Sequence, residues 1–430
     1  MNAVGAILTC FFCVAAFVVP RRLAALSMLA ATLYITEGQA LDLGINFMAI
    51  RFVELAAFLR VIVRGELFKI TFTSADRWLL TFFVTLVGIY ILRTGIFDWY
   101  IFGQAVDGWL TYFCFRSLIT DFDEFTFFLK GATMLLVPYA LLMTFEAQTG
   151  RNLFALMGGI PDTPELREGH YRCQGSFRIA ITAGSLGATF VSLFAGFLFH
   201  RTCRGWALGG VVSCIVIVLA SHSSGPLMAA ATAIAGWACW YARRDMKWVR
   251  RGVVAILVAL QLTMSSPAWF IFDRLSGIFG GDGWHRSNLI DQFIHSFAHW
   301  WLAGMPIGMT SDWAATQMSW GGVDVTNYYV AIGLNGGLLP FTLFLVFLTA
   351  CFKSIGRALA RLRAQPEPPE YAEAILWGAG CTVCVHVVNL TAVSYWDQFY
   401  VIWYLHLAIA TSLSTYVLSK YPSASAPGTV

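Results

Sequence analysis

Long apolar segments recur along nearly the whole chain, separated by short polar, glycine-containing or proline-containing breaks. A helix needs about 20 residues to cross a hydrocarbon core of about 30 Å, and many of the segments approach that length. The pattern predicts about 12 to 13 membrane-spanning helices. The weakest separations are Pro20-Arg21-Arg22 and the turn SHSSG at Ser221 to Gly225. The predicted spans are 4–19, 23–36, 44–62, 78–94, 104–119, 126–145, 179–199, 206–220, 224–241, 252–268, 327–350, 373–392 and 397–418.

Composition agrees with this pattern, because 58% of the residues are hydrophobic and 12% are charged. Soluble domains carry charge on about a quarter of their residues, so a water-soluble fold is excluded. The segments between the spans are too short for a separate soluble domain. We therefore expect an all-α polytopic membrane protein with a single membrane domain over residues 1–418. Residues 419–430, rich in small residues and proline, are predicted to form a disordered tail.

The positive charges predict how the chain crosses the membrane, since Lys and Arg are retained in short cytoplasmic loops. Clusters such as Arg21-Arg22 and the run RRDMKWVRR from Arg243 to Arg251 alternate consistently, which puts the N-terminus outside and the C-terminus inside. The net charge of +4 comes from the cytoplasmic loops and implies no nucleic-acid partner. All five lysines then lie near the cytoplasmic side. The basic residues left outside are arginines: Arg51, Arg93, Arg151, Arg167, Arg172, Arg178, Arg274 and Arg286.

Arginines on the outer side need a reason, and gripping phosphate oxygens in two places is one that suits the planar guanidinium. The alternative is that they cap acidic neighbours or extend toward lipid headgroups. Two outer segments, 146–178 and 269–326, hold most of the remaining polar residues. The first delivers four arginines and four acidic residues to the start of the span at 179–199.

The second outer segment contains a predicted amphipathic helix, RSNLIDQFIHSFAHWWLAG. Its apolar face is expected to consist of Leu289, Ile290, Phe293, Ile294 and Phe297, and its polar row of Ser287, Asp291, His295 and His299. Residues four apart share a helix face, so Asp291 can orient His295 as a general base. The row is equally compatible with the wetted face of an interfacial helix. A metal site on Asp291, His295 and His299 is also conceivable, but it lacks further ligands.

A few polar residues fall inside predicted spans or at their ends. Arg51 and Glu54, three apart, are expected to neutralise one another. His222, His386 and Asn389 are interpreted as hydrogen-bonding groups between helices rather than as catalytic groups.

Four segments, taken in order, resemble the superfamily of O-antigen ligases and O-antigen or exopolysaccharide polymerases (Wzy-type). They are EGHYRCQGSFRIAITAG, SHSSGPLMA, HRSNLIDQFIHSFAHWWLAG and DVTNYYVAIGLNGGLLPF, and the similarity covers roughly residues 40–350. The resemblance implies a fold like that of GT-C glycosyltransferases in the bacterial inner membrane, with its active site facing the periplasm. The implied donor is an oligosaccharide on undecaprenyl diphosphate.

The resemblance also assigns candidate residues. Arg172 in YRCQGSF and Arg286 in HRSNLID would hold the diphosphate, with Arg178 and Asn327 as further substrate-binding residues. Such a donor is already activated, so neither ATP, another cofactor nor a metal is expected. His295, oriented by Asp291, is the first candidate for a general base and His299 is the second.

One departure from the family pattern affects the predicted reaction. Ligases carry a His, then Asn, Ser or Gln, then nine residues and a Gly, whereas this chain has Thr326, Asn327 and Gly337 in those places. A threonine cannot act as a base near neutral pH. Polymerisation of lipid-linked repeat units is therefore favoured over transfer to lipid A core.

Two alternative functions stay open. One is ligase-like transfer of the lipid-linked glycan to another acceptor, and the other is transport of a lipid-linked sugar. Transporters often contain internal repeats, and no clear repeat relates the two halves of this sequence. The expected partners are the lipid-linked donor and acceptor and the bilayer itself, with flippase and chain-length-regulating proteins as further candidates.

Overall fold

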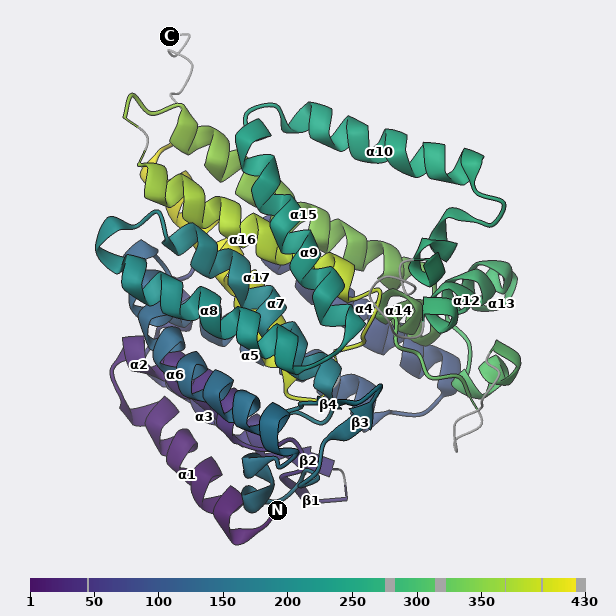
Figure 1. The fold of residues 1–430 in the computed structure, drawn as a ribbon, viewed down its shortest axis with the longest axis horizontal. Coiled ribbons are helices and arrows are strands. Elements are labelled where there is room, and N and C mark those ends of the chain that lie inside the picture. Colours follow the sequence, from purple (N-terminus) through teal and green to yellow (C-terminus); the bar gives the residue numbers. More distant parts are fainter. Residues whose placement is uncertain (45, 275–282, 314–321, 368, 396, 423–430) are drawn as a thin grey trace.

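The computed structural model describes the chain except for residues 45, 275–282, 314–321, 368, 396 and 423–430. Long helices run side by side through a bundle, and short hairpins and helices gather at one end of it (Figure 1). The first half contains α1 (Ala3–Val18), α2 (Arg21–Tyr34), β1 (Ala40–Asp42), β2 (Asn46–Met48), α3 (Ala49–Val63), α4 (Ser74–Thr94), α5 (Trp99–Leu118), α6 (Phe122–Thr149), β3 (Glu165–Arg167), β4 (His170–Arg172) and α7 (Ala180–Phe197). The second half contains α8 (Arg204–Ala220), α9 (Ser224–Ala238), α10 (Met246–Thr263), α12 (Gly283–His295), α13 (Phe297–Trp300), α14 (Tyr328–Gly336), α15 (Leu338–Arg363), α16 (Glu370–Asn389) and α17 (Phe399–Lys420).

A helix overlaps every predicted span, which confirms an all-α polytopic membrane protein. Among the described residues, seven helices are long and apolar enough to cross a membrane, or up to eight if one bent pair counts as a span. The predicted 12 to 13 are not reached by this criterion, partly because α1, α2, α3 and α9 have only 14 to 16 residues. The predicted span 327–350 is divided between α14 and α15 at Gly337, which has a φ of 77°. A Cβ there would lie 2.9 Å from the backbone of Leu302 and Ala303.

The hairpins β1–β2 and β3–β4 share one end of the bundle with α12 to α14 (Figure 1). The N-terminus lies at this end, where the amino group of Met1 donates a hydrogen bond to the carbonyl of Ala40 at 2.6 Å. At the opposite end, Arg243 and Arg363 share the carboxylate of Glu373 at 3.1 and 2.7 Å. The predicted outer loops and the predicted cytoplasmic arginines therefore lie at opposite ends. Which end faces the periplasm stays a prediction.

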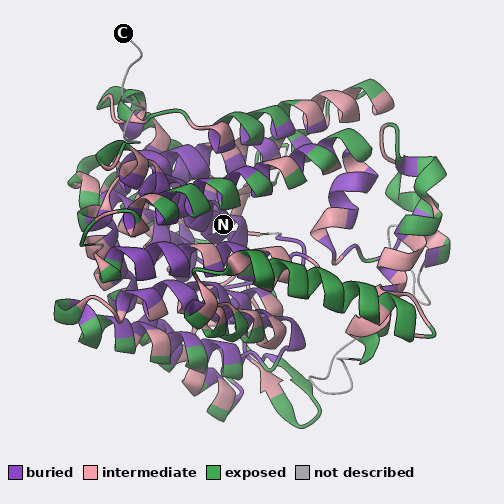
Figure 2. Cartoon of the chain, turned by 90° about the horizontal axis from the view of Figure 1, so that it is seen from above, coloured by how far each residue is buried: buried purple, intermediate pink, exposed green. Residues whose placement is uncertain are grey.

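The core is formed by α7, α16 and α17. In each of these helices, more than two thirds of the residues in the apolar stretch that could span a membrane are buried. Buried positions concentrate in this bundle, whereas α10 has no buried residue among its 18 (Figure 2). After α10 the chain bends by 96° into residues Ala268–Arg274. The apolar surface of α10 therefore faces the surroundings rather than other helices of this chain.

Small residues bring α7 and α16 into close contact. A Cβ added to Gly378 would lie 2.5 Å from the carbonyl oxygen of Ser192, and one on Gly196 would lie 2.7 Å from the carbonyl oxygen of Ala374. Membrane helices depend on such close packing because lipid is as apolar as their side chains.

We expect Gly378→Val to lower the free energy of unfolding by about 1–3 kcal/mol, since a backbone contact cannot move aside as a flexible side chain would. Thermal unfolding of the purified protein in detergent measures the effect. Gly88→Val on α4 is the matched control, because apart from its chain neighbours and the nearby backbone of α4 itself no heavy atom lies within 4 Å of a Cβ at that position. Equal melting temperatures for the two variants would contradict the close packing of α7 on α16.

Buried polar groups also join the helices. The sequence predicts that Arg51 pairs with Glu54, but its main partner is Asp107 of α5. Arg51 forms a bidentate ion pair with this residue, with its Nη2 at 2.8 Å and its Nε at 2.9 Å from Oδ2. Glu54 instead accepts hydrogen bonds from Thr111 and Tyr400. A carboxylate on the neighbouring helix reaches the planar fork of the guanidinium better than one a turn away on the same helix.

The prediction that His386 and Asn389 form hydrogen bonds between helices is confirmed. The Nε2 atom of His386 lies 2.9 Å from Nδ1 of His406 on α17, and Asn389 donates to Ser185 of α7 at 2.9 Å.

Candidate functional site

Two cavities open at the end of the bundle that carries the hairpins. The first, here called the basic cavity, has a volume of about 340 Å³ and lies among β4, the start of α9 and the start of α12. Its polar lining includes Arg167, Arg172, Arg286, His170, His222, His285, Thr326, Ser223, Ser224, Glu168 and Asp324. It thus brings together the two arginines predicted to hold a diphosphate, although 114 positions separate them in the sequence.

Both arginines approach the segment SHSSG, whose last two residues begin α9. The Nη2 atom of Arg172 donates to Oγ of Ser223 at 3.0 Å. The Nη2 atom of Arg286 lies 3.8 Å from the point that a Cβ on Gly225 would occupy. The first N–H groups of a helix have no partner within that helix, and they form the positive end of its dipole. Two guanidinium groups beside such a terminus create a site suited to phosphate.

Two buried polar atoms in the basic cavity lack a hydrogen-bond partner within the described part of the chain: Nε of Arg172 and Oγ1 of Thr326. Buried polar groups in proteins are nearly always paired, and exceptions point to a missing ion, water or ligand. Arg172 also pairs with Glu165 at 2.6 Å. Because Glu165 is 62% exposed, this pair can open toward solvent when an anion competes for the guanidinium.

Two histidines stack against each other in the basic cavity. The ring centroids of His170 and His222 are 4.6 Å apart and their planes differ by 5°. Burial, and then the neighbouring His170, lower the pKa of His222 below its ordinary value. The shift favours the neutral ring, which can donate or accept a hydrogen bond. His222 lies in the turn between α8 and α9 and lines the basic cavity, and its interpretation as a hydrogen-bonding link between helices stays a prediction.

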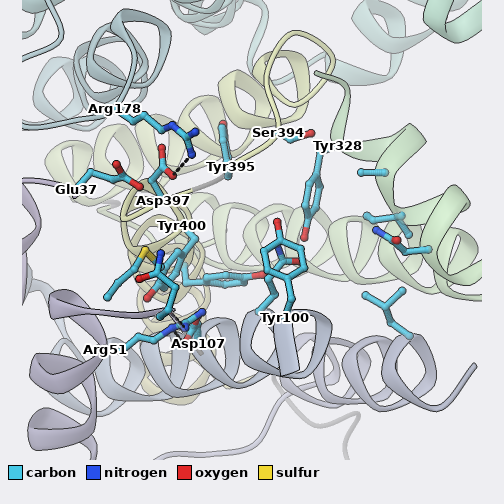
Figure 3. A pocket seen from close by; sticks show the side chains of 18 of the residues that line it. Glu37, Arg51, Tyr100, Asp107, Arg178, Tyr328, Ser394, Tyr395, Asp397 and Tyr400 are labelled. Carbon is cyan, nitrogen blue, oxygen red and sulfur yellow. Dashed lines mark hydrogen bonds and ion pairs between the residues drawn. The ribbon is translucent and has the colours of Figure 1, made fainter. Parts of the chain in front are cut away.

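The second cavity, here called the tyrosine cavity, has a volume of about 390 Å³. Its aromatic lining consists of Trp99, Tyr100, Tyr328, Tyr395, Tyr400 and Tyr404. Figure 3 shows the tyrosines around the cavity, with Arg51 paired to Asp107 on one side and Arg178 directed toward Asp397 on another. Glu37 lies beside Asp397 in the same view.

Asp397 and Glu37 form a carboxyl pair that the sequence analysis missed. The side chain of Asp397 is only 7% exposed, and its Oδ1 lies 4.0 Å from Nη1 of the exposed Arg178. Burial, the charge of Glu37 and a hydrogen bond between the two carboxyl groups raise the pKa of Asp397 to about 8. Two neighbouring carboxyl groups do not ionise together readily, so Asp397 keeps its proton to a higher pH than an ordinary aspartate. The two residues are 360 positions apart, and no sequence motif marks either of them.

The two cavities are neighbours across a thin wall. Thr326 and Ala392 line the basic cavity, whereas Tyr328 and Ser394, two positions further along each segment, line the tyrosine cavity. The hydroxyl of Ser394 donates to the carbonyl of Val325 at 2.9 Å and ties the two segments together. A molecule held in one cavity is therefore close to a molecule held in the other.

The predicted catalytic histidines lie elsewhere. Nδ1 of His295 is 3.3 Å from Oδ2 of Asp291, so the expected pairing on α12 is present. The side chain of His295 is 69% exposed, however, and neither His295 nor His299 lines the two cavities. Asp291 also accepts a hydrogen bond from Trp269 at 3.1 Å. Among the described residues, no three His, Cys, Asp or Glu side chains, those of Asp291, His295 and His299 included, lie close enough together to hold a metal ion.

The predicted amphipathic helix is present but shorter than its pattern suggests. Leu289 and Phe293 are buried, Phe293 stacks on Trp300 at 4.0 Å, and the helix is interrupted at Ser296 between α12 and α13. Ile294 and Phe297, expected on the apolar face, are 44% and 45% exposed.

The two remaining predicted substrate ligands occupy different places. Arg178 lines the tyrosine cavity, apart from Arg172 and Arg286. Asn327 is 2% exposed, and its Oδ1 accepts hydrogen bonds from the backbone of Tyr329 and Val330. Its side-chain oxygen therefore caps α14.

The fold and these cavities define a polytopic membrane protein with an arginine-rich cavity and a tyrosine-rich cavity side by side at one end of its bundle. No protein-family model matches the chain, and no curated protein matches it.

Proposed function

We propose that this protein is a membrane glycosyltransferase that polymerises oligosaccharide repeat units carried on undecaprenyl diphosphate, on the periplasmic face of the bacterial inner membrane. The observation that carries the proposal is the convergence of Arg172 and Arg286 on the start of α9 in one cavity. A diphosphate is the chemical group that best suits two guanidinium forks and a helix N-terminus.

The proposed reaction joins two lipid-linked chains. A hydroxyl of the acceptor sugar attacks the anomeric carbon of the donor, the bond from that carbon to the phosphate oxygen breaks, and the electron pair leaves with the lipid diphosphate. Arg172 and Arg286 stabilise the charge that develops on the departing group. The proton of the attacking hydroxyl needs an acceptor.

The carboxyl pair of Asp397 and Glu37 is better placed to accept this proton than His295. Asp397 is buried and lines the cavity next to the basic cavity, whereas His295 is exposed and lines neither. A base with a pKa near the working pH combines a usable ionised fraction with sufficient basicity. Asp397, with its pKa raised to about 8, meets this condition.

A reconstitution experiment tests the proposal. Purified protein in vesicles receives a defined undecaprenyl-diphosphate oligosaccharide, and the lipid-linked products are separated by length. We expect a ladder of longer lipid-linked glycans without added nucleotide. Consumption of the donor without lengthening would reject polymerisation. Transfer of the glycan to an added acceptor that carries no lipid diphosphate would indicate the ligase reaction. Movement of intact substrate across the vesicle, with no new product, would indicate transport.

A further inference from the structure

We propose that the tyrosine cavity is a binding site for uncharged sugar rings, and that it holds the acceptor end of the growing glycan. This inference rests on the proposed function and deepens it by assigning a chemical class of ligand to the second cavity. Its volume of about 390 Å³ falls within the range of small-molecule sites, about 300–1,000 Å³.

The tyrosine rings are fixed by hydrogen bonds from their hydroxyl groups to other protein atoms. The hydroxyl of Tyr400 donates to Oε2 of Glu54 at 3.0 Å, and the hydroxyl of Tyr395 lies 2.7 Å from Nδ1 of His386. The hydroxyl groups of Tyr328 and Tyr404 bond to each other. Since these polar tips already have partners, the rings contribute rigid apolar surface to the cavity. One face of a sugar ring carries C–H groups and packs on such a surface.

The charges of the tyrosine cavity disfavour a phosphate. Three carboxyl groups, on Glu37, Asp107 and Asp397, accompany two arginines in its lining. Arg51 is already paired with Asp107 through both Nε and Nη2, and Arg178 is 68% exposed at its edge. The basic cavity has the opposite balance, with three arginines and three histidines against Glu168 and Asp324. A diphosphate sugar is thereby directed to one cavity and an uncharged sugar to the other.

The tyrosine cavity also offers groups that match sugar hydroxyls. Gln104 and Asn335 line it, and each carboxamide supplies both donors and an acceptor. The carboxyl pair of Asp397 and Glu37 adds acceptors beside them. Such a combination of aromatic faces with a few placed polar groups is typical of sites that orient a neutral polar ligand.

The position of the cavity agrees with a role for the acceptor. The segments around Val325 and Ser394 form the wall between the two cavities, and they are joined by a hydrogen bond of 2.9 Å. A sugar hydroxyl held against this wall, near Asp397, faces the compartment in which the donor diphosphate would lie. The acceptor molecule also carries a diphosphate. Because the tyrosine cavity disfavours phosphate, that diphosphate would not compete with the sugar end of the same molecule for this cavity.

Saturation-transfer NMR on the purified full-length protein tests the assignment. The probes are a panel of neutral sugars (glucose, galactose, mannose and N-acetylglucosamine), and inorganic pyrophosphate binding is measured separately by calorimetry. We expect at least one neutral sugar to bind. Tyr100→Ala, which removes a ring that is 49% exposed, should weaken that binding by about tenfold or more, as loss of an aromatic anchor typically does.

Tyr241→Ala is the matched control, because this tyrosine is 91% exposed and lies outside both cavities. Arg172→Ala should abolish pyrophosphate binding and leave sugar binding intact. Pyrophosphate binding without binding of any sugar would overturn the inference and leave the diphosphate site standing. Sugar binding that is lost in Arg172→Ala and kept in Tyr100→Ala would also overturn it. Failure of pyrophosphate itself to bind would remove the main support for the proposed function instead.

Discussion

Arg172→Lys and Arg286→Lys are each expected to reduce the rate of glycan transfer by about 10²–10³-fold, the usual effect of losing one preorganised donor to a developing negative charge. Lysine keeps the positive charge but not the planar fork that meets two phosphate oxygens. Arg172 would also lose the geometry that directs Nη2 toward Ser223. The measurement is the initial rate of lengthening of the lipid-linked glycan.

Arg151→Lys is the control for these substitutions. Arg151 is an exposed arginine in the same outer segment as Arg172, and it does not line either cavity. We expect its rate to match that of the unmodified protein. Near-normal turnover in both Arg172→Lys and Arg286→Lys would eliminate the diphosphate site in the basic cavity.

Asp397→Asn should lower the rate by about 10²–10⁴-fold, the range over which a positioned general base accelerates a reaction. Only the ionised carboxylate accepts a proton, and the pKa of Asp397 is raised to about 8 by burial and by Glu37. The rate of the unmodified protein should therefore rise about tenfold per pH unit below pH 8 and level off above it. Rates measured from pH 5.5 to 9.5 test this profile.

Two further variants identify the origin of the pH dependence. Glu37→Gln removes the neighbouring negative charge, so it should lower the pKa of Asp397 and move the rise in rate to lower pH. His295→Ala should leave the profile unchanged. A rise centred near pH 6.5 that disappears in His295→Ala would instead support the histidine as the base.

The sequence predicts the helices of this protein well because membrane spans are specified locally. Each span needs about 20 apolar residues, and that requirement is visible in any window of the chain. Boundaries and continuity depend on tertiary contacts, which is why the break at Gly337 was missed: its cause is the backbone of Leu302 and Ala303, more than 30 positions away. The same reason explains the exposure of Ile294 and Phe297, since the helical pattern gave no sign of the interruption at Ser296.

The candidate site was predictable only in part. Arg172 and Arg286 stood out because arginine is unexpected on the outer side and because their surrounding segments resemble a known superfamily. Asp397 and Glu37 gave no such signal, since their significance comes from burial and from a partner distant in sequence. His295 and Asp291 are paired as expected, but helical spacing could not show that their face of α12 points away from both cavities.

The order in which the chain is synthesised has a consequence for when activity can appear. The basic cavity takes Arg172 from the middle of the chain, Arg286 later, and Ala392 from near the end. The tyrosine cavity likewise joins Glu37 to Tyr404. Because chains enter the membrane from the N-terminus onward, the basic cavity is complete only after Ala392, which follows α16, and the tyrosine cavity only after α17 has been inserted. Under the proposed function, an unfinished chain cannot hold the donor and the acceptor together, and loss of α17 should abolish glycan transfer even though Arg172 and Arg286 remain.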